Sequence, residues 1–206
     1  MIKYYKIRRV LNEMKKHREK VVRNTYETIK TLNIPFYIIG KDVSEHKPLL
    51  LEDDSMCFYA DAFQLSKYAG ATYAKEIFIA DWWLWDVPTP DNVVNCIVSE
   101  GYQKDFSPKD RLYSIIVHET NHVLNRRNIV GSPIVTYKNF FDKMNTMDPA
   151  KRVLTTAKDE FHAYKAAQGN ILGMSDDDIK RTIERNLGIT VDWSAISVDW
   201  NTTNEI

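Results

Sequence analysis

Apolar residues recur at helical spacing along several stretches of the chain. Between residues 2 and 32, one stripe is formed by Ile7, Leu11, Met14, Val21, Val22, Tyr26 and Ile29. This pattern predicts a long amphipathic helix that ends before Pro35. A second helix is predicted to begin at Ser107 and Pro108, an N-cap followed by proline at the first helical position, and to end before Gly131.

Two further helices are predicted in the last third of the chain. Asp148 and Pro149 again form an N-cap with proline after it, and the helix is expected to stop at Gly169. Ser175, followed by three aspartates, predicts a shorter helix that ends near Gly188. The carboxyl-terminal half is therefore expected to be mostly helical.

Short apolar runs between the first two helices favour strands. Residues 36–39, 56–60 and 76–80 are rich in β-branched and aromatic side chains. The pattern thus predicts an α+β fold, with a small mixed sheet packed on a central helix and a long helix at the amino terminus. We expect two units, residues 1–34 as a basic amphipathic helix and residues 35–206 as the main domain.

Charge is balanced over the whole chain but not along it. The formal net charge is zero, while residues 1–32 hold ten Lys/Arg against three Glu, a net of +7. The overall balance favours neither a nucleic acid nor a membrane surface as partner, and no apolar run is long enough for a membrane span. The basic face of the first helix is either solvated or a docking surface for an acidic protein partner.

The two cysteines, Cys57 and Cys96, have no zinc-knuckle spacing and favour buried thiols over a disulfide. Charges are scattered through the amino terminus, with no apolar segment typical of a Sec signal peptide. We expect the protein to work in the cytoplasm or within a larger particle.

The predicted central helix carries the sequence His118-Glu119-Thr120-Asn121-His122. Residues four apart stack on one face of a helix, so both imidazoles can point at one ion. Glu119, directly after the first histidine, is placed to act as general base for a water that the ion holds. This H-E-x-x-H arrangement predicts a catalytic zinc site.

A catalytic zinc needs a third protein ligand and an open position. Helical spacing places Glu160 on the apolar face of the following helix, with Ala157 and Tyr164. A carboxylate there is costly unless it meets a cation, so Glu160 is the favoured third ligand. His162 competes for this role, although it falls on the side of the helix that carries lysines. Asp159 is a possible partner that orients a ligand histidine.

These residues resemble the zincin metallopeptidases, in particular the gluzincin branch, whose third zinc ligand is a glutamate on a later helix. The resemblance rests on His118, Glu119, His122 and the Glu160 segment, and it covers about the central third of the chain. It implies a zincin-like fold with Zn²⁺ on His118, His122 and Glu160, and with Glu119 as base. Tyr164, one turn after Glu160, is our choice for the donor that stabilises the oxyanion.

The resemblance implies a peptidase whose peptide or protein substrate adds as a strand along the edge of the sheet. Arg126 stands where thermolysin-like members have an acidic residue. Two other functions stay open. One is a zincin-fold structural or interaction subunit of a larger assembly, for example a phage particle. The other is an amide hydrolase that uses the same residues on a carbonyl other than that of a peptide.

Overall fold

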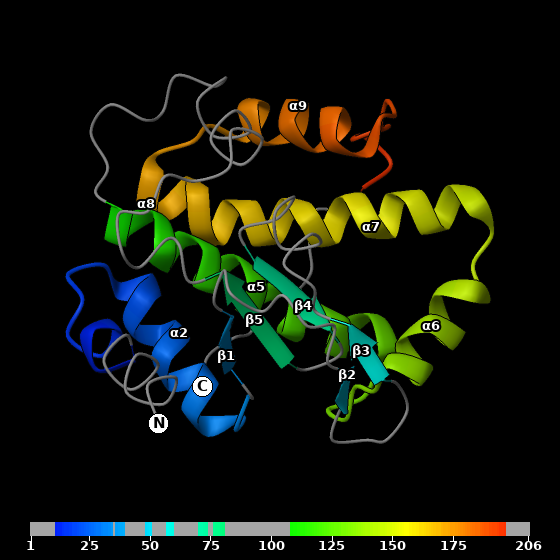
Figure 1. Cartoon of the computed structure of the whole chain (residues 1–206). Coiled ribbons are helices and arrows are strands. Elements are labelled where there is room, and N and C mark those ends of the chain that lie inside the picture. Colours follow the sequence, from blue (N-terminus) through cyan, green and yellow to red (C-terminus); the bar gives the residue numbers. More distant parts are fainter. Residues whose placement is uncertain are drawn as a thin grey trace.

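A computed structural model gives the arrangement of the chain (Figure 1). It describes residues 11–34, 36–39, 48–50, 57–59, 70–73, 76–80 and 108–196. Side chains are described for residues 11–34, 110, 113–136 and 138–196. The predicted N-cap Ser107 lies outside the described residues.

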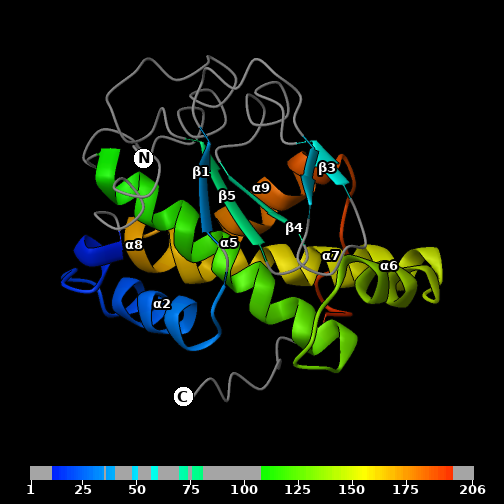
Figure 2. The same cartoon turned by 60° about the horizontal axis from the view of Figure 1, so that its bottom comes forward.

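Helix α5 (Pro108–Val130) is the element around which the described part of the molecule is arranged. It contacts α2 (Lys20–Thr31), α6 (Tyr137–Asn145), α7 (Pro149–Tyr164) and two strands (Figure 2). Five successive residues, 113–117, are all buried, and at 100° per residue they cover every face of the helix. Helix α5 is therefore enclosed on all sides over these residues, which makes a buried polar side chain in this part costly unless it has a partner.

Helix α7 runs beside α5 and is continued by a π-helical turn, η2 (Lys165–Gly169), and by α8 (Asn170–Leu172). It begins as predicted, because the Asp148 side chain accepts a hydrogen bond from the Lys151 backbone N–H at 2.8 Å. It ends later than predicted, at Gly173, whose φ of 72° is readily adopted only by glycine.

Helix α9 (Asp176–Leu187) packs on the side of α7 away from α5. Ser175 accepts a hydrogen bond from the Asp178 N–H at 3.2 Å, which confirms the predicted N-cap. The apolar core between the two helices consists of Ala157, Phe161, Met174, Ile179, Ile183, Val191 and Ile196. Helix α7 is thus buried on two sides, by α5 and by α9.

The amino-terminal segment differs from the continuous helix that its apolar stripe predicted. Residues 11–14 are helical, residues 15–19 form turns and bends, and α2 begins at Lys20. Arg23 stabilises this break by donating to the carbonyl oxygens of His17 and Arg18 at 2.6 and 2.7 Å. Met14, Val22 and Ile29 are buried, and α2 packs against α5. The apolar face of this segment is therefore used inside the molecule.

The described residues between α2 and α5 form five short strands: β1 (Phe36–Ile39), β2 (Pro48–Leu50), β3 (Cys57–Tyr59), β4 (Gly70–Tyr73) and β5 (Glu76–Ala80). Strand β5 pairs with β1 in parallel and with β4 in antiparallel register, while β2 pairs with β3. Each strand has three to five residues.

The predicted fold class, α+β with a small mixed sheet packed on the central helix, is wrong. The part of the chain with described side chains is 73% helical and contains no strand. Helices α5 and α7, which hold many of its buried apolar residues, each contact two or more neighbouring helices. The described fold is therefore predominantly helical, and the zincin-like architecture is not supported.

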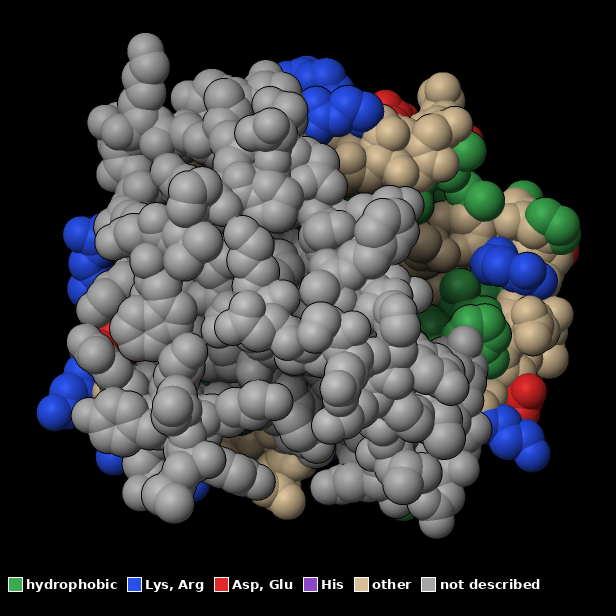
Figure 3. Space-filling model, viewed as in Figure 1, with side chains coloured by type: hydrophobic (Ala, Val, Ile, Leu, Met, Phe, Trp, Pro, Cys, Tyr) green, Lys and Arg blue, Asp and Glu red, His purple; other side chains and the backbone are tan. Residues whose placement is uncertain are grey.

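The described surface at the right of Figure 3 mixes hydrophobic side chains with Lys and Arg. Exposed apolar residues of the described part include Ile134 just before α6, Phe141 within α6 and Val153 on α7.

Helix α6 begins with a capping box in which Thr136 and Asn139 exchange hydrogen bonds of 2.8 and 3.0 Å. No helix among the described residues is both long and apolar enough to cross a membrane.

Candidate metal centre

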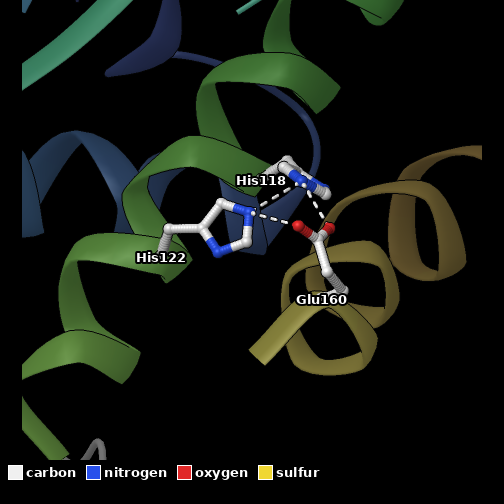
Figure 4. A group of neighbouring side chains, drawn as sticks. All are labelled: His118, His122 and Glu160. Atoms are coloured by element: carbon white, nitrogen blue, oxygen red, sulfur yellow. Dashed lines mark hydrogen bonds and ion pairs between the residues drawn. The ribbon is translucent and has the colours of Figure 1, made fainter. Parts of the chain in front are cut away.

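His118 and His122 on α5 and Glu160 on α7 point toward one another (Figure 4). The Nε2 atoms of the two histidines are 3.0 Å apart. The Glu160 oxygens lie 3.6 Å from His118 Nε2 and 3.7 Å from His122 Nε2. Within the described part of the chain, this is the group of His, Cys, Asp and Glu side chains that could hold a metal ion.

These separations are close to those of a tetrahedral zinc site. Ligand atoms about 2.1 Å from zinc, at tetrahedral angles, are about 3.4 Å from one another. The two imidazole nitrogens are 3.0 Å apart, Glu160 Oε2 lies 3.6 Å from His118 Nε2, and the other oxygen, Oε1, lies 3.7 Å from His122 Nε2. Two imidazole nitrogens and a carboxylate oxygen are also the donor set of a catalytic zinc, and three protein ligands leave one position open. The residues present therefore fit the ion that the sequence predicted.

The ligand histidines are aligned because they are one helical turn apart on α5. Glu160 comes from α7, about one turn before the end of that helix, and α7 packs against α5. His162, the competing third ligand, does not belong to the group. Its ring lies 6.1 Å from that of Phe161, and burial together with Lys158 lowers its pKa. The arrangement thus brings Glu160 rather than His162 to the two histidines.

Asp159 connects the two helices behind the ligands. Its Oδ1 lies 3.0 Å from His122 Nδ1, the ring nitrogen opposite the one that faces the cluster. Asn125 on α5 donates to the same Oδ1 at 2.8 Å and to the Asp159 backbone carbonyl at 3.2 Å. A carboxylate on the outer nitrogen fixes the tautomer and the orientation of a ligand histidine. Asp159 therefore takes the position that the sequence suggested for it, and Asn125 holds it there.

The two histidines differ in their proton affinity because their neighbours differ. Burial and the adjacent His122 lower the pKa of His118 to about 3. Burial also acts to lower the pKa of His122, but Asp159 and Glu160 outweigh it and raise the pKa to about 9. Two Nε2 atoms 3.0 Å apart cannot both carry a proton, so at most one of the facing nitrogens is protonated at neutral pH.

Negative charge is concentrated at the centre. Glu119 and Glu160 act on His122 together with Asp159. His122 and, to a smaller extent, Arg126 lower the pKa of Asp159 and oppose the rise in that of Glu160. Metal binding requires both imidazoles to be neutral, so His122 must lose its proton, and three carboxylates and one guanidinium then leave a net charge of −2. A divalent cation neutralises that charge, which is a second reason why the centre suits a metal ion.

Glu119 and Tyr164, the predicted catalytic residues, both lie beside the ligands. Glu119 is buried on α5 and interacts electrostatically with His122 and Glu160. The Tyr164 ring meets that of His118 edge-on at 4.6 Å, and its hydroxyl accepts a hydrogen bond from Asn186 of α9 at 3.1 Å. Tyr164 therefore touches the centre with its ring, and its role as an oxyanion donor stays a prediction.

Two residues of this region, Asn125 and Gln168, were not identified from the sequence. Asn125 is three residues after His122, a spacing that shares a helix face and is a usable signal. Gln168 belongs to the π-helical turn, and no sequence pattern marked it.

No protein-family model matches the chain, and no curated protein or solved structure is significantly similar to it. The site must therefore be judged on its own geometry.

Proposed function

We propose that the protein is a zinc-dependent hydrolase that cleaves peptide bonds, with His118, His122 and Glu160 as the metal ligands. The observation that carries the proposal is the convergence of their donor atoms, with separations of 3.0 to 3.7 Å. Zinc in such a donor set polarises a carbonyl group and activates a water molecule at neutral pH.

Glu119 supplies the general base in this proposal. Its carboxylate is buried next to the ligand histidines, where it can take a proton from the attacking water and return it to the leaving amine. Asp159 keeps the His122 ring turned so that Nε2 faces the cluster. Tyr164 remains the proposed donor to the oxyanion, provided that its hydroxyl can leave Asn186. The choice of a peptide as substrate is based on the resemblance of the H-E-x-x-H motif to that of zincin metallopeptidases, and not on the described geometry.

The test begins with the metal. Purified protein, supplied with zinc at neutral pH and then dialysed, should hold about one zinc per chain by elemental analysis. The loaded protein is next incubated with a mixture of peptides, and new amino termini are identified by mass spectrometry. The Glu119→Gln variant, which should keep zinc, is the matched control for a contaminating peptidase.

Cleavage by the wild type and not by Glu119→Gln would support the proposal. Zinc without cleavage of any peptide would reject the peptide as substrate and favour another amide. Failure to bind zinc would reject the function altogether and turn attention to a structural or interaction role.

A further inference from the structure

His118 and Gln168 carry complementary polar atoms, a ring nitrogen that can donate and an amide oxygen that can accept. Both His118 Nδ1 and Gln168 Oε1 are buried, and within the described part of the chain neither has a completed hydrogen bond. Burial and His122 lower the pKa of His118, and Gln168 is one of the groups that act to raise it. Whether the bond forms depends on which ring nitrogen carries the proton. With the proton on Nδ1, the donor His118 and the acceptor Gln168 are satisfied together.

The π-helical turn brings Gln168 to this position. Gln168 is eight residues after Glu160, which in an uninterrupted α-helix would place it about 80° around the axis from Glu160. One extra residue in the π-helical turn reduces the effective spacing to about seven residues, or about 20° from the direction of Glu160. Turn η2 contacts α5, the helix that carries His118. The irregularity thus turns Gln168 toward α5.

We propose that Gln168 is a positioning residue for the metal centre: its Oε1 accepts a hydrogen bond from His118 Nδ1 and so directs Nε2 to the metal. This inference rests on the proposed zinc site. It gives each ligand histidine its own outer acceptor, because Asp159 lies 3.0 Å from His122 Nδ1 in the same manner. The two acceptors belong to one helical run, Asp159 to α7 and Gln168 to η2.

The chemistry of the acceptor matches the charge of the site. Glu119, Asp159 and Glu160 already give the centre three carboxylates. A fourth carboxylate at His118 would add repulsion among them, whereas an amide oxygen fixes the tautomer without adding charge. Gln168 therefore completes the orientation of the ligands at no electrostatic cost.

The test compares zinc affinity in three variants. Gln168→Leu removes the acceptor with little change in volume, Gln168→Glu restores an acceptor, and Asn170→Ala changes an exposed residue of the same segment. Zinc affinity is measured by competition with a coloured chelator, and thermal melting of the metal-free proteins monitors the fold. We expect Gln168→Leu to bind zinc about 10- to 100-fold more weakly. Gln168→Glu should recover most of the affinity, and Asn170→Ala should match the wild type.

A second measurement needs no variant. Long-range ¹H–¹⁵N spectra of the zinc-loaded wild type should show His118 protonated at Nδ1, with a proton that exchanges slowly with water. Wild-type zinc affinity in Gln168→Leu would overturn the inference and leave the proposed function intact. Zinc bound through Nδ1 of His118 in the wild type would also overturn it, even if the leucine variant did not fold. A wild type that binds no zinc would reject the function and the inference together.

Discussion

Histidine and carboxylate side chains lie close together at two places along α5, and the two places differ in the groups that the imidazole nitrogens face. At the first turn, His17 of the amino-terminal segment has Nε2 3.7 Å from Asp110, and its Nδ1 accepts the Glu19 backbone N–H at 3.1 Å. Its ring also packs against that of Tyr113 at 4.8 Å. In the middle of α5, His118 and His122 face one another with Nε2 atoms 3.0 Å apart.

The difference shows what distinguishes the candidate metal centre from a structural histidine. Both ring nitrogens of His17 lie against other groups of the protein, so a metal ion could bind only by displacing them. At the middle of α5, the side chains of two histidines and a glutamate converge, and the Asp159 carboxylate approaches the His122 ring from behind. Proximity of histidine to a carboxylate is therefore a weak indication of a metal site. Convergence of the donor atoms is a strong one.

The largest effect is expected on zinc content when a histidine of the candidate metal centre, and not His17, is replaced. His122→Ala should reduce bound zinc from about one per chain to a background level, because two ligands do not hold zinc against dialysis. His17→Ala, the matched control, should keep its zinc. Elemental analysis after dialysis measures both. Equal loss in the two variants would mean that the metal, if any, depends on the fold as a whole.

Catalysis should separate from metal binding at Glu119. Glu119→Gln should retain zinc within a few-fold of the wild-type affinity and lose about 10²- to 10⁴-fold in turnover, since the base and not a ligand is removed. Peptide cleavage and zinc content are measured on the same preparation. Turnover that survives in Glu119→Gln would exclude this residue as the base.

The third ligand is tested by two substitutions on α7. Glu160→Ala should weaken zinc binding far more than His162→Ala, because the Glu160 oxygens lie 3.6 and 3.7 Å from the ligand nitrogens. The alanine variant of His162 also controls for damage to α7. Chelator competition gives both affinities, and the opposite order would make His162 the ligand.

Replacing Asn125 should have a smaller effect, which should be visible both in the free energy of unfolding and in zinc affinity. Asn125→Leu leaves the buried Asp159 carboxylate with one donor fewer, which should lower the free energy of unfolding by about 1–3 kcal/mol. The loosened Asp159 should also weaken zinc binding by about 10- to 100-fold. Urea unfolding and chelator competition measure these effects, with exposed Asn128→Ala as the control on the same helix. An unchanged zinc affinity would limit Asn125 to a structural role.

The smallest effect concerns the pH dependence of stability at His17. Burial lowers the pKa of His17, although Asp110 and Glu19 act to raise it. The unfolded chain then binds a proton more readily than the folded one, so stability should fall as the pH drops below about 6.5. His17→Gln should lose less stability than the wild type between pH 7.5 and pH 5.5 in urea unfolding. Identical losses would show that His17 does not contribute.

Much of the candidate site could be predicted from local sequence signals. The i, i+4 spacing aligned His118 with His122, and the Asp148-Pro149 pair gave the beginning of α7. Glu160 was found because a carboxylate on an apolar helix face needs a cation. Part of that reasoning was inaccurate, however, since Ala157, which was placed on the same face, belongs to the core shared with α9.

The remaining features depend on contacts that a sequence does not display. The apolar stripe of the first helix continues through residues 15–19, so nothing in its period predicted the turns that Arg23 stabilises there. In an uninterrupted α-helix, Gln168 would point about 80° away from Glu160. The π-helical turn reduces this angle and turns Gln168 toward the side of α5. Short apolar runs predicted strands. They did not predict that the part of the chain with described side chains would be mostly helical.

The most direct test of the centre is X-ray absorption at the zinc edge of the loaded protein. We expect four nitrogen or oxygen ligands at about 2.0–2.2 Å, two of them with the multiple-scattering pattern of imidazole. His122→Ala, loaded in excess zinc, should lose one imidazole from this pattern. A sulfur ligand at about 2.3 Å, or a spectrum unchanged in His122→Ala, would place the zinc elsewhere and contradict a site formed by His118, His122 and Glu160.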